Sequence, residues 1–161
     1  VGMPGGDLPP RRGDGQLLRL TQALSEDRPE DYGLPEARAM LPHAHAVFMS
    51  DFLGDMTGIT AALTKAADRG VRGLLVQVLD PAEEGFPFQG RTIFESMGQG
   101  IDHETLNAAE LKKQYLHRLA ARKAELQTLC AATGWHYLCH HTGTSAQSAL
   151  LWLYRAIEGQ R

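Results

Sequence analysis

Residues 45–55 read HAVFMSDFLGD, and this stretch decides the fold. Its apolar run predicts a buried strand that ends at Ser50 and Asp51, where a polar loop begins. Residues 71–81 read VRGLLVQVLDP, a second apolar run without alternation, which is typical of a strand buried on both faces of a parallel sheet. Between them, residues 55–70 have the apolar spacing of a helix. Strand, helix and strand in this order predict a right-handed βαβ unit.

Helices and strands continue to alternate on either side of this unit. The sequence predicts a helix at 15–24, a short helix at 34–41, an edge strand at 91–97, a loop at 98–106, a long helix at 107–133, a strand at 135–141 and a last helix after Ser145. This order predicts an α/β protein, a three-layer α/β/α sandwich with a mostly parallel sheet. We expect a single domain over residues 17–161, preceded by an extended segment at residues 1–16 that is rich in Gly and Pro.

Apolar spacing also predicts which face of each helix is buried, and short signals predict where helices begin and end. The expected inward faces are Leu17, Leu20, Thr21 and Leu24; Leu111, Tyr115, Leu119, Leu126 and Leu129; and Ala149, Leu150, Leu153 and Ile157. Asn107 and Ser145 are expected to be N-caps, and Gly70 is expected at a left-handed C-terminal cap.

Composition excludes several classes of protein. The 161 residues include 16 basic and 19 acidic ones, giving a net charge of −3 without the basic patch of a nucleic-acid-binding protein. The sequence contains no run of 18 apolar residues, so it predicts no membrane-spanning helix. Residues 1–15 lack the apolar centre of a signal peptide. Cys130 and Cys139 form neither a CxxC pair nor a disulfide framework, so we expect buried, reduced thiols and a cytoplasmic location.

Asp51 has two interpretations. As a carboxylate at the end of a strand it would bind a hard cation, with the hydroxyls of Ser50 and Thr57 as weaker candidate ligands. Alternatively, Asp51 or Asp55 caps the helix that follows and interacts with its dipole. For a single acidic residue after a strand, we favour the structural role.

Two other polar groups follow predicted strands. Asp80, Glu83 and Glu84 would form either a second acidic cluster or a solvated turn, and we favour the turn. His140 and His141 are possible zinc ligands, but adjacent strand residues point to opposite faces and no HExxH spacing accompanies them. We therefore expect structural roles for these histidines. The chain also lacks the GxGxxG, GxxxxGKS and GxSxG motifs of nucleotide-binding proteins and hydrolases.

Four stretches in order carry a resemblance to a known family. They are PPRRG at 9–13, VFMSDFLGD at 47–55, VQVLDPAEEGFPFQG at 76–90 and LKKQYLHRLAARKAEL at 111–126. Together they resemble the C-terminal half of the bacterial family catalogued as domain of unknown function 58, which is similar to von Willebrand factor A domains. The resemblance implies a von Willebrand A-like fold from about residue 8 onward.

The resemblance also implies an incomplete metal site. Asp51 matches the metal-binding Asp on the fourth strand of von Willebrand A domains, but their DxSxS motif is absent here. One carboxylate binds Mg²⁺ or Mn²⁺ poorly, because these ions need several oxygen ligands held together. We expect metal binding only if residues outside this chain complete the site. The chain is then either a fragment or a divergent module that has lost the metal.

Two functions remain open. The first is a non-catalytic protein-interaction module, for which the resemblance implies a MoxR-type AAA+ ATPase as partner in protein assembly or maturation. Without the first strand of the full fold, the strand at 46–52 has an open edge, so we also expect a homo-oligomer. The alternative is a metal-assisted hydrolase or phosphoryl-transfer domain centred on Asp51, with Asp80 or His140 nearby. We favour the interaction module, because only one convincing strand-end carboxylate is present.

Overall fold

The computed structural model describes residues 2–3, 6–7, 12–25, 40–88, 92–95, 102–105 and 108–159. The chain divides into two compact units. One unit is built from Val1–Glu36 and Ile93–Glu104, and the other from Ala37–Thr92 and Thr105–Arg161. The predicted short helix at 34–41 and the predicted cap Asn107 lie largely outside the described residues.

The N-terminal segments form small elements. Strands β1 (Gly2–Met3) and β2 (Gly6–Asp7) pair in antiparallel fashion, and helix α1 spans Asp14–Ser25. The expected inward face of α1 is only partly right, because Leu20 is half-buried whereas Leu17 is 62% exposed.

Strands β5 (Thr92–Glu95) and β6 (Asp102–Thr105) form a separate two-stranded sheet. The prediction that residues 91–97 form an edge of the main sheet is therefore wrong, since β5 pairs with β6 instead. The loop predicted at 98–106 contains β6, a strand whose polar sequence DHET gives no apolar alternation.

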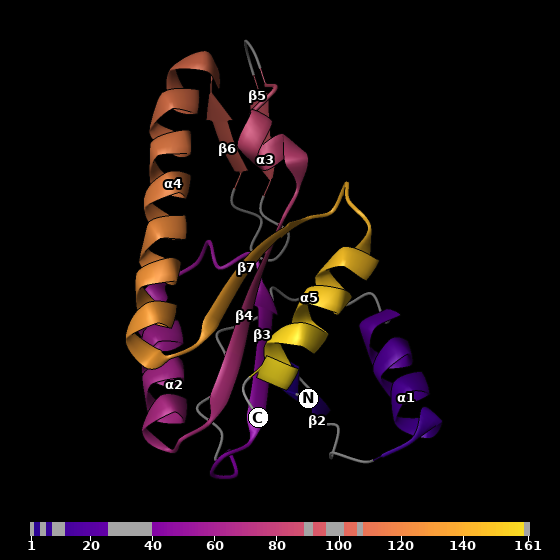
Figure 1. Ribbon diagram of the computed structural model, residues 1–161. Helices are drawn as coiled ribbons and strands as arrows, with labels where there is room; N and C mark the ends of the chain where they lie inside the picture. Colours follow the sequence, from indigo (N-terminus) through magenta and orange to yellow (C-terminus); the bar gives the residue numbers. More distant parts are fainter. Residues whose placement is uncertain are drawn as a thin grey trace. The chain divides into compact units, whose positions relative to one another are not determined.

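Three parallel strands form the main sheet (Figure 1). They are β3 (His45–Ser50), β4 (Arg72–Leu79) and β7 (His136–His141), in the order β3-β4-β7. The register pairs His45 with Arg72 and Leu74 with His136. The α/β class and the parallel sheet are thus confirmed.

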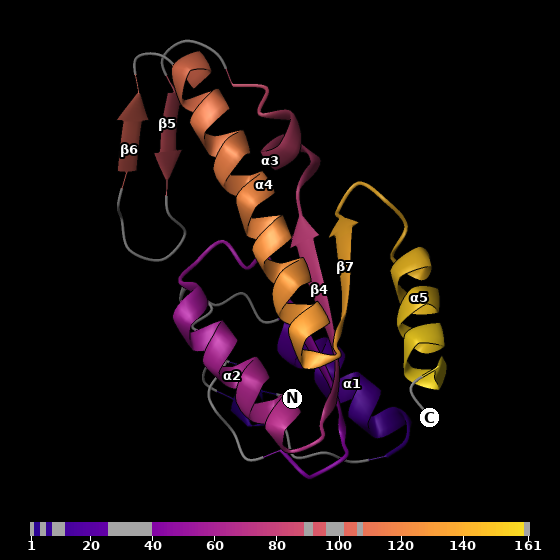
Figure 2. The same cartoon turned by 60° about the vertical axis from the view of Figure 1, so that its left-hand side comes forward.

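Helices flank this sheet. Helix α2 (Met56–Asp68) joins β3 to β4, and α4 (Ala108–Thr133) precedes β7. The short α3 (Pro81–Gly85) follows β4, and α5 (Ala146–Gly159) follows β7. Figure 2 shows α2 and α4 on one side of the sheet and α5 on the other. None of the described helices is both long enough and apolar enough to cross a bilayer.

The main core lies between the sheet and helices α2 and α4. Leu63 of α2, Leu75 of β4 and Leu126 of α4 are fully buried. Each such side chain contributes about 1.5–3 kcal/mol through removal of its apolar surface from water. The predicted buried stripe of α4 is confirmed, since Leu119 and Leu126 are buried and its other members are half-buried.

Helix ends follow the sequence signals closely. Gly70 adopts a left-handed conformation, with φ +70°, after α2, and the Ser145 hydroxyl accepts a hydrogen bond from the Gln147 N–H at the start of α5. In α5, Leu153 and Ile157 are half-buried as expected. Leu150 is 61% exposed, so its predicted inward orientation is wrong.

Candidate functional site

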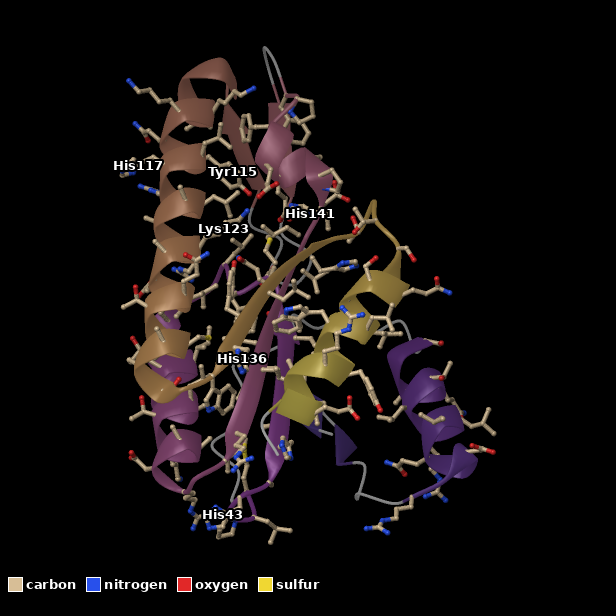
Figure 3. The ribbon with its side chains drawn as sticks, in the orientation of Figure 1. His43, Tyr115, His117, Lys123, His136 and His141 are labelled. Carbon is tan, nitrogen blue, oxygen red and sulfur yellow. The ribbon has the colours of Figure 1, made fainter. Side chains whose placement is uncertain are left out.

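The carboxyl ends of β3, β4 and β7 lie side by side at one end of the sheet, because all three strands run parallel. We call this end the carboxyl edge of the sheet. Asp51 follows β3, Asp80 follows β4, and His140 and His141 end β7. In open parallel sheets this edge is the usual place for ligands. Figure 3 shows His141 near this edge and His43 at the opposite end of the sheet.

The Asp51 carboxylate is used within its own loop. Its Oδ1 accepts hydrogen bonds from the Leu53 N–H at 3.1 Å and from the Ser50 hydroxyl at 3.3 Å. Thr57 does not join them, because its hydroxyl donates to Asp55 Oδ1 at 3.1 Å. Asp55 occupies the N-cap position of α2 but accepts no backbone hydrogen bond there. Of the three candidate metal ligands, only Ser50 and Asp51 are in contact.

Side chains from β4 and α4 hold the carbonyl groups of this loop. The Gln77 amide donates to the Asp51 carbonyl at 2.8 Å. The Arg122 guanidinium donates to the carbonyls of Phe52 and Gly54, both at 2.6 Å. Phe52 itself is buried in a left-handed conformation with φ 53°. The loop therefore has a fixed shape, with Asp51 exposed on it.

Asp80 caps helix α3. Its Oδ1 accepts from the Ala82 N–H at 2.8 Å, and its own N–H donates to Glu83 Oε2 at 2.7 Å, which is a capping box. Its Oδ2 accepts from the Thr142 hydroxyl at 3.0 Å. The Ala82 hydrogen bond, followed by that of Thr142, lowers the pKa of Asp80. The carboxylate thus joins the start of α3 to the loop after β7.

Glu84 brings α3, α4 and β7 together. Its Oε2 lies 2.7 Å from His141 Nε2, and its Oε1 pairs with the Lys123 ammonium. The Cys139 sulfur completes a group whose ligand atoms all lie within 4.8 Å of one another. Figure 3 labels Lys123 on α4 and His141 on β7. Among the described residues, this is the one group of three or more His, Cys, Asp or Glu side chains with such spacing.

A buried polar pair lies between this group and the Asp51 loop. Gln77 is fully buried, and its Oε1 accepts from the Tyr137 hydroxyl at 2.6 Å. Burial, followed by the neighbouring Cys139, raises the pKa of Tyr137, so the phenol stays protonated and donates. Gln77 therefore links β7 to the carbonyl of Asp51 across the sheet.

The sequence did not indicate that Glu84 lies close to Cys139 and His141. Adjacent histidines do diverge as expected: His141 contacts Glu84, whereas His140 Nδ1 lies 3.4 Å from the Thr144 hydroxyl. The pattern Cys139-x-His141 could have indicated two members of this group, because residues two positions apart on a strand point to the same face of the sheet. Asp51, Asp80 and His140 join no such group within the described part of the chain.

Comparison with known proteins finds a matching family. A family model described as "Protein of unknown function DUF58" matches residues 5–125, which is more than half of the chain. The match ends within α4 and leaves β7 and α5 outside. No curated protein and no solved structure matches the chain.

Proposed function

Since the chain belongs to the family of proteins of unknown function DUF58, as its sequence motifs indicated, we propose a function from its own residues and from its resemblance to von Willebrand A domains. The proposal is a non-catalytic protein-interaction module with a von Willebrand A-like, three-layer α/β/α architecture. The parallel β3-β4-β7 sheet with flanking helices supports this architecture.

The observation that carries the proposal is the fixed loop that exposes Asp51. Metal-assisted catalysis needs two or more ligands that converge on one point. At Asp51 the nearest partners are a hydroxyl and a backbone N–H, neither of which is an anionic ligand. A rigid loop loses little conformational entropy when a partner binds, and this favours a role in recognition.

The surface around Asp51 suits a protein partner. Leu53, two residues on, is 37% exposed beside the carboxylate. An apolar side chain next to a charged one resembles the mixed composition of transient protein interfaces. The resemblance to von Willebrand A domains suggests the class of partner, a MoxR-type AAA+ ATPase that acts in protein assembly or maturation.

Direct binding to a purified MoxR-type ATPase from the same genome tests this proposal. Calorimetric titration should give a micromolar complex that Asp51→Ala weakens about tenfold or more. Asp55→Ala is the matched control, because Asp55 is an exposed carboxylate on the same loop whose Oδ1 accepts a hydrogen bond from the Thr57 hydroxyl. Absence of binding, or equal loss in both variants, would contradict the proposal. Phosphatase activity that requires Mn²⁺ and Asp51 would favour the alternative function, a metal-assisted hydrolase or phosphoryl-transfer domain.

We further propose that the chain associates with itself through β3. Within the described residues, β3 pairs with β4 alone and has no strand paired to its other edge. Val47 and Met49 on this strand are 36% and 64% exposed. An open edge with apolar side chains readily pairs with a second copy.

A further inference from the structure

Three side chains with different donor atoms meet at the carboxyl end of the sheet. We define Glu84, Cys139 and His141 as the metal-ligand cluster. Their carboxylate oxygen, thiol sulfur and imidazole nitrogen lie within 4.8 Å of one another, and all three residues are half-buried. The proposed interaction function does not use this cluster, which involves neither Asp51 nor its loop.

The β4–β7 register and the turn after β4 bring these residues together. Cys139 and His141 share one face of β7, being two residues apart. The register places His141 beside Leu79, the last residue of β4. The chain then turns at Asp80 into α3, and this turn returns Glu84 to within 2.7 Å of His141 Nε2. The capping box of Asp80 and Glu83 fixes the start of α3, the helix that carries Glu84.

The donor set fits zinc better than it fits magnesium or manganese. Zinc binds Cys sulfur at about 2.3 Å and His nitrogen or carboxylate oxygen at about 2.0–2.2 Å. A tetrahedral zinc site thus holds its ligand atoms about 3.3–3.8 Å apart. The Glu84 and His141 ligand atoms lie 2.7 Å apart and no pair in the cluster exceeds 4.8 Å, so small side-chain rotations reach this geometry. Magnesium and manganese prefer oxygen ligands and would leave the thiol unused.

Lys123 orients the Glu84 carboxylate for zinc binding. Its ammonium pairs with Glu84 Oε1, which leaves Oε2 directed at His141. The side chains of Glu84 and His141 are 37% and 31% exposed, so an ion can enter from solvent. Zinc binding replaces the hydrogen bond between His141 Nε2 and Glu84 Oε2, and it releases the thiol proton of Cys139.

We propose that Glu84, Cys139 and His141 bind one zinc ion, with a fourth position open to water or to a donor group of a partner. Three protein ligands with an open fourth position are the pattern of zinc sites that exchange ligands, whereas purely structural zinc sites have four. The site lies at the same edge of the sheet as Asp51 and is built from different residues.

Zinc titration of the whole chain without a histidine tag tests this site. Competition with a chromogenic chelator should give one zinc ion per chain. Cys139→Ala, His141→Ala and Glu84→Gln should each weaken zinc binding about tenfold or more. The matched controls are Cys130→Ala and His140→Ala, because Cys130 is buried and His140 contacts Thr144. Both controls should keep the wild-type affinity.

Cobalt(II) supplies a second readout that identifies the donor atom. The wild-type chain should show a thiolate-to-cobalt charge-transfer band that Cys139→Ala removes and Cys130→Ala retains. Far-UV circular dichroism establishes that each variant is folded before titration. No zinc uptake by the wild type, equal losses in His140→Ala and His141→Ala, or a cobalt spectrum without the thiolate band would each overturn the proposal.

Discussion

Gly73 of β4 lies against the indole of Trp135 with no room for a side chain. A Cβ atom at position 73 would lie 2.0 Å from Cδ2 of the ring and 2.1 Å from Cε2 and Cε3. Carbon atoms that pack without strain stay about 3.5–4.0 Å apart. In the Gly73→Ala variant the indole would therefore have to move by about 1.5 Å.

This movement is costly because the indole is held in place. Trp135 is 4% exposed, its Nε1–H donates to the Val71 carbonyl at 3.2 Å, and its ring stacks on Phe48 at a centroid distance of 5.4 Å. Overpacking costs about 1–3 kcal/mol, and loss of the hydrogen bond and of the stacking costs about 1 kcal/mol each. We expect Gly73→Ala to lower the free energy of unfolding by about 4 kcal/mol.

Urea unfolding followed by far-UV circular dichroism measures this change. Trp135→Ala alone should cost about 3–5 kcal/mol, but adding Gly73→Ala to it should cost less than about 1 kcal/mol, because no ring remains to meet the new Cβ. Gly54→Ala is the control, since a Cβ there meets nothing within 4 Å. If Gly73→Ala costs the same in both backgrounds, or no more than Gly54→Ala, the steric reasoning is wrong.

Three further predictions concern the same unit. Gln77→Leu should cost about 3 kcal/mol in urea unfolding, because it leaves the Tyr137 hydroxyl and the Asp51 carbonyl unpaired; adding Tyr137→Phe should recover part of this. Met49→Lys should shift a self-associating chain to monomer in light scattering, since a charge on an edge strand opposes pairing; a wild type that is monomeric at high concentration would exclude the β3 interface. Burial raises the pKa of the Cys130 thiol from 9.0 to about 11. A raised folded-state pKa gives stability that is present below pH 9 and is lost towards pH 11, by roughly 3 kcal/mol. Urea unfolding of Cys130→Ala across that pH range should not show this loss.

The main sheet could be predicted because its strands are apolar runs set between periodic helices. In β4, burial on both faces follows directly from the apolar side chains. The predicted burial of β3 is wrong, because no residue of β3 is buried and Met49 is 64% exposed. Strand β6 could not be found this way, because Asp102–Thr105 is entirely polar and pairs only with its neighbour β5. Leu150 was placed inward by helical spacing alone, which does not show how far the covered face of α5 extends.

The candidate sites were predictable to different degrees. The position of Asp51 at a strand end follows from the βαβ pattern. Its hydrogen bond to Leu53 is a local property of loops with Asp, so a structural role was a fair expectation. The contact between Glu84 and His141 joins residues 57 positions apart and depends on the β4–β7 register, which no local pattern specifies.

The register of the sheet has a consequence for the order of folding. Strand β4 pairs with β3 across 27 positions (72 − 45) but with β7 across 62 (136 − 74). Closing the longer chain segment between β4 and β7 costs about 0.7 kcal/mol more in chain entropy than closing the segment between β3 and β4. We therefore expect β3, α2 and β4 to assemble before β7 docks. Cys139 and His141 both belong to β7, so zinc would bind only after this last step. In stopped-flow experiments, zinc should therefore slow unfolding and leave the refolding rate unchanged, and faster refolding with zinc would contradict this order.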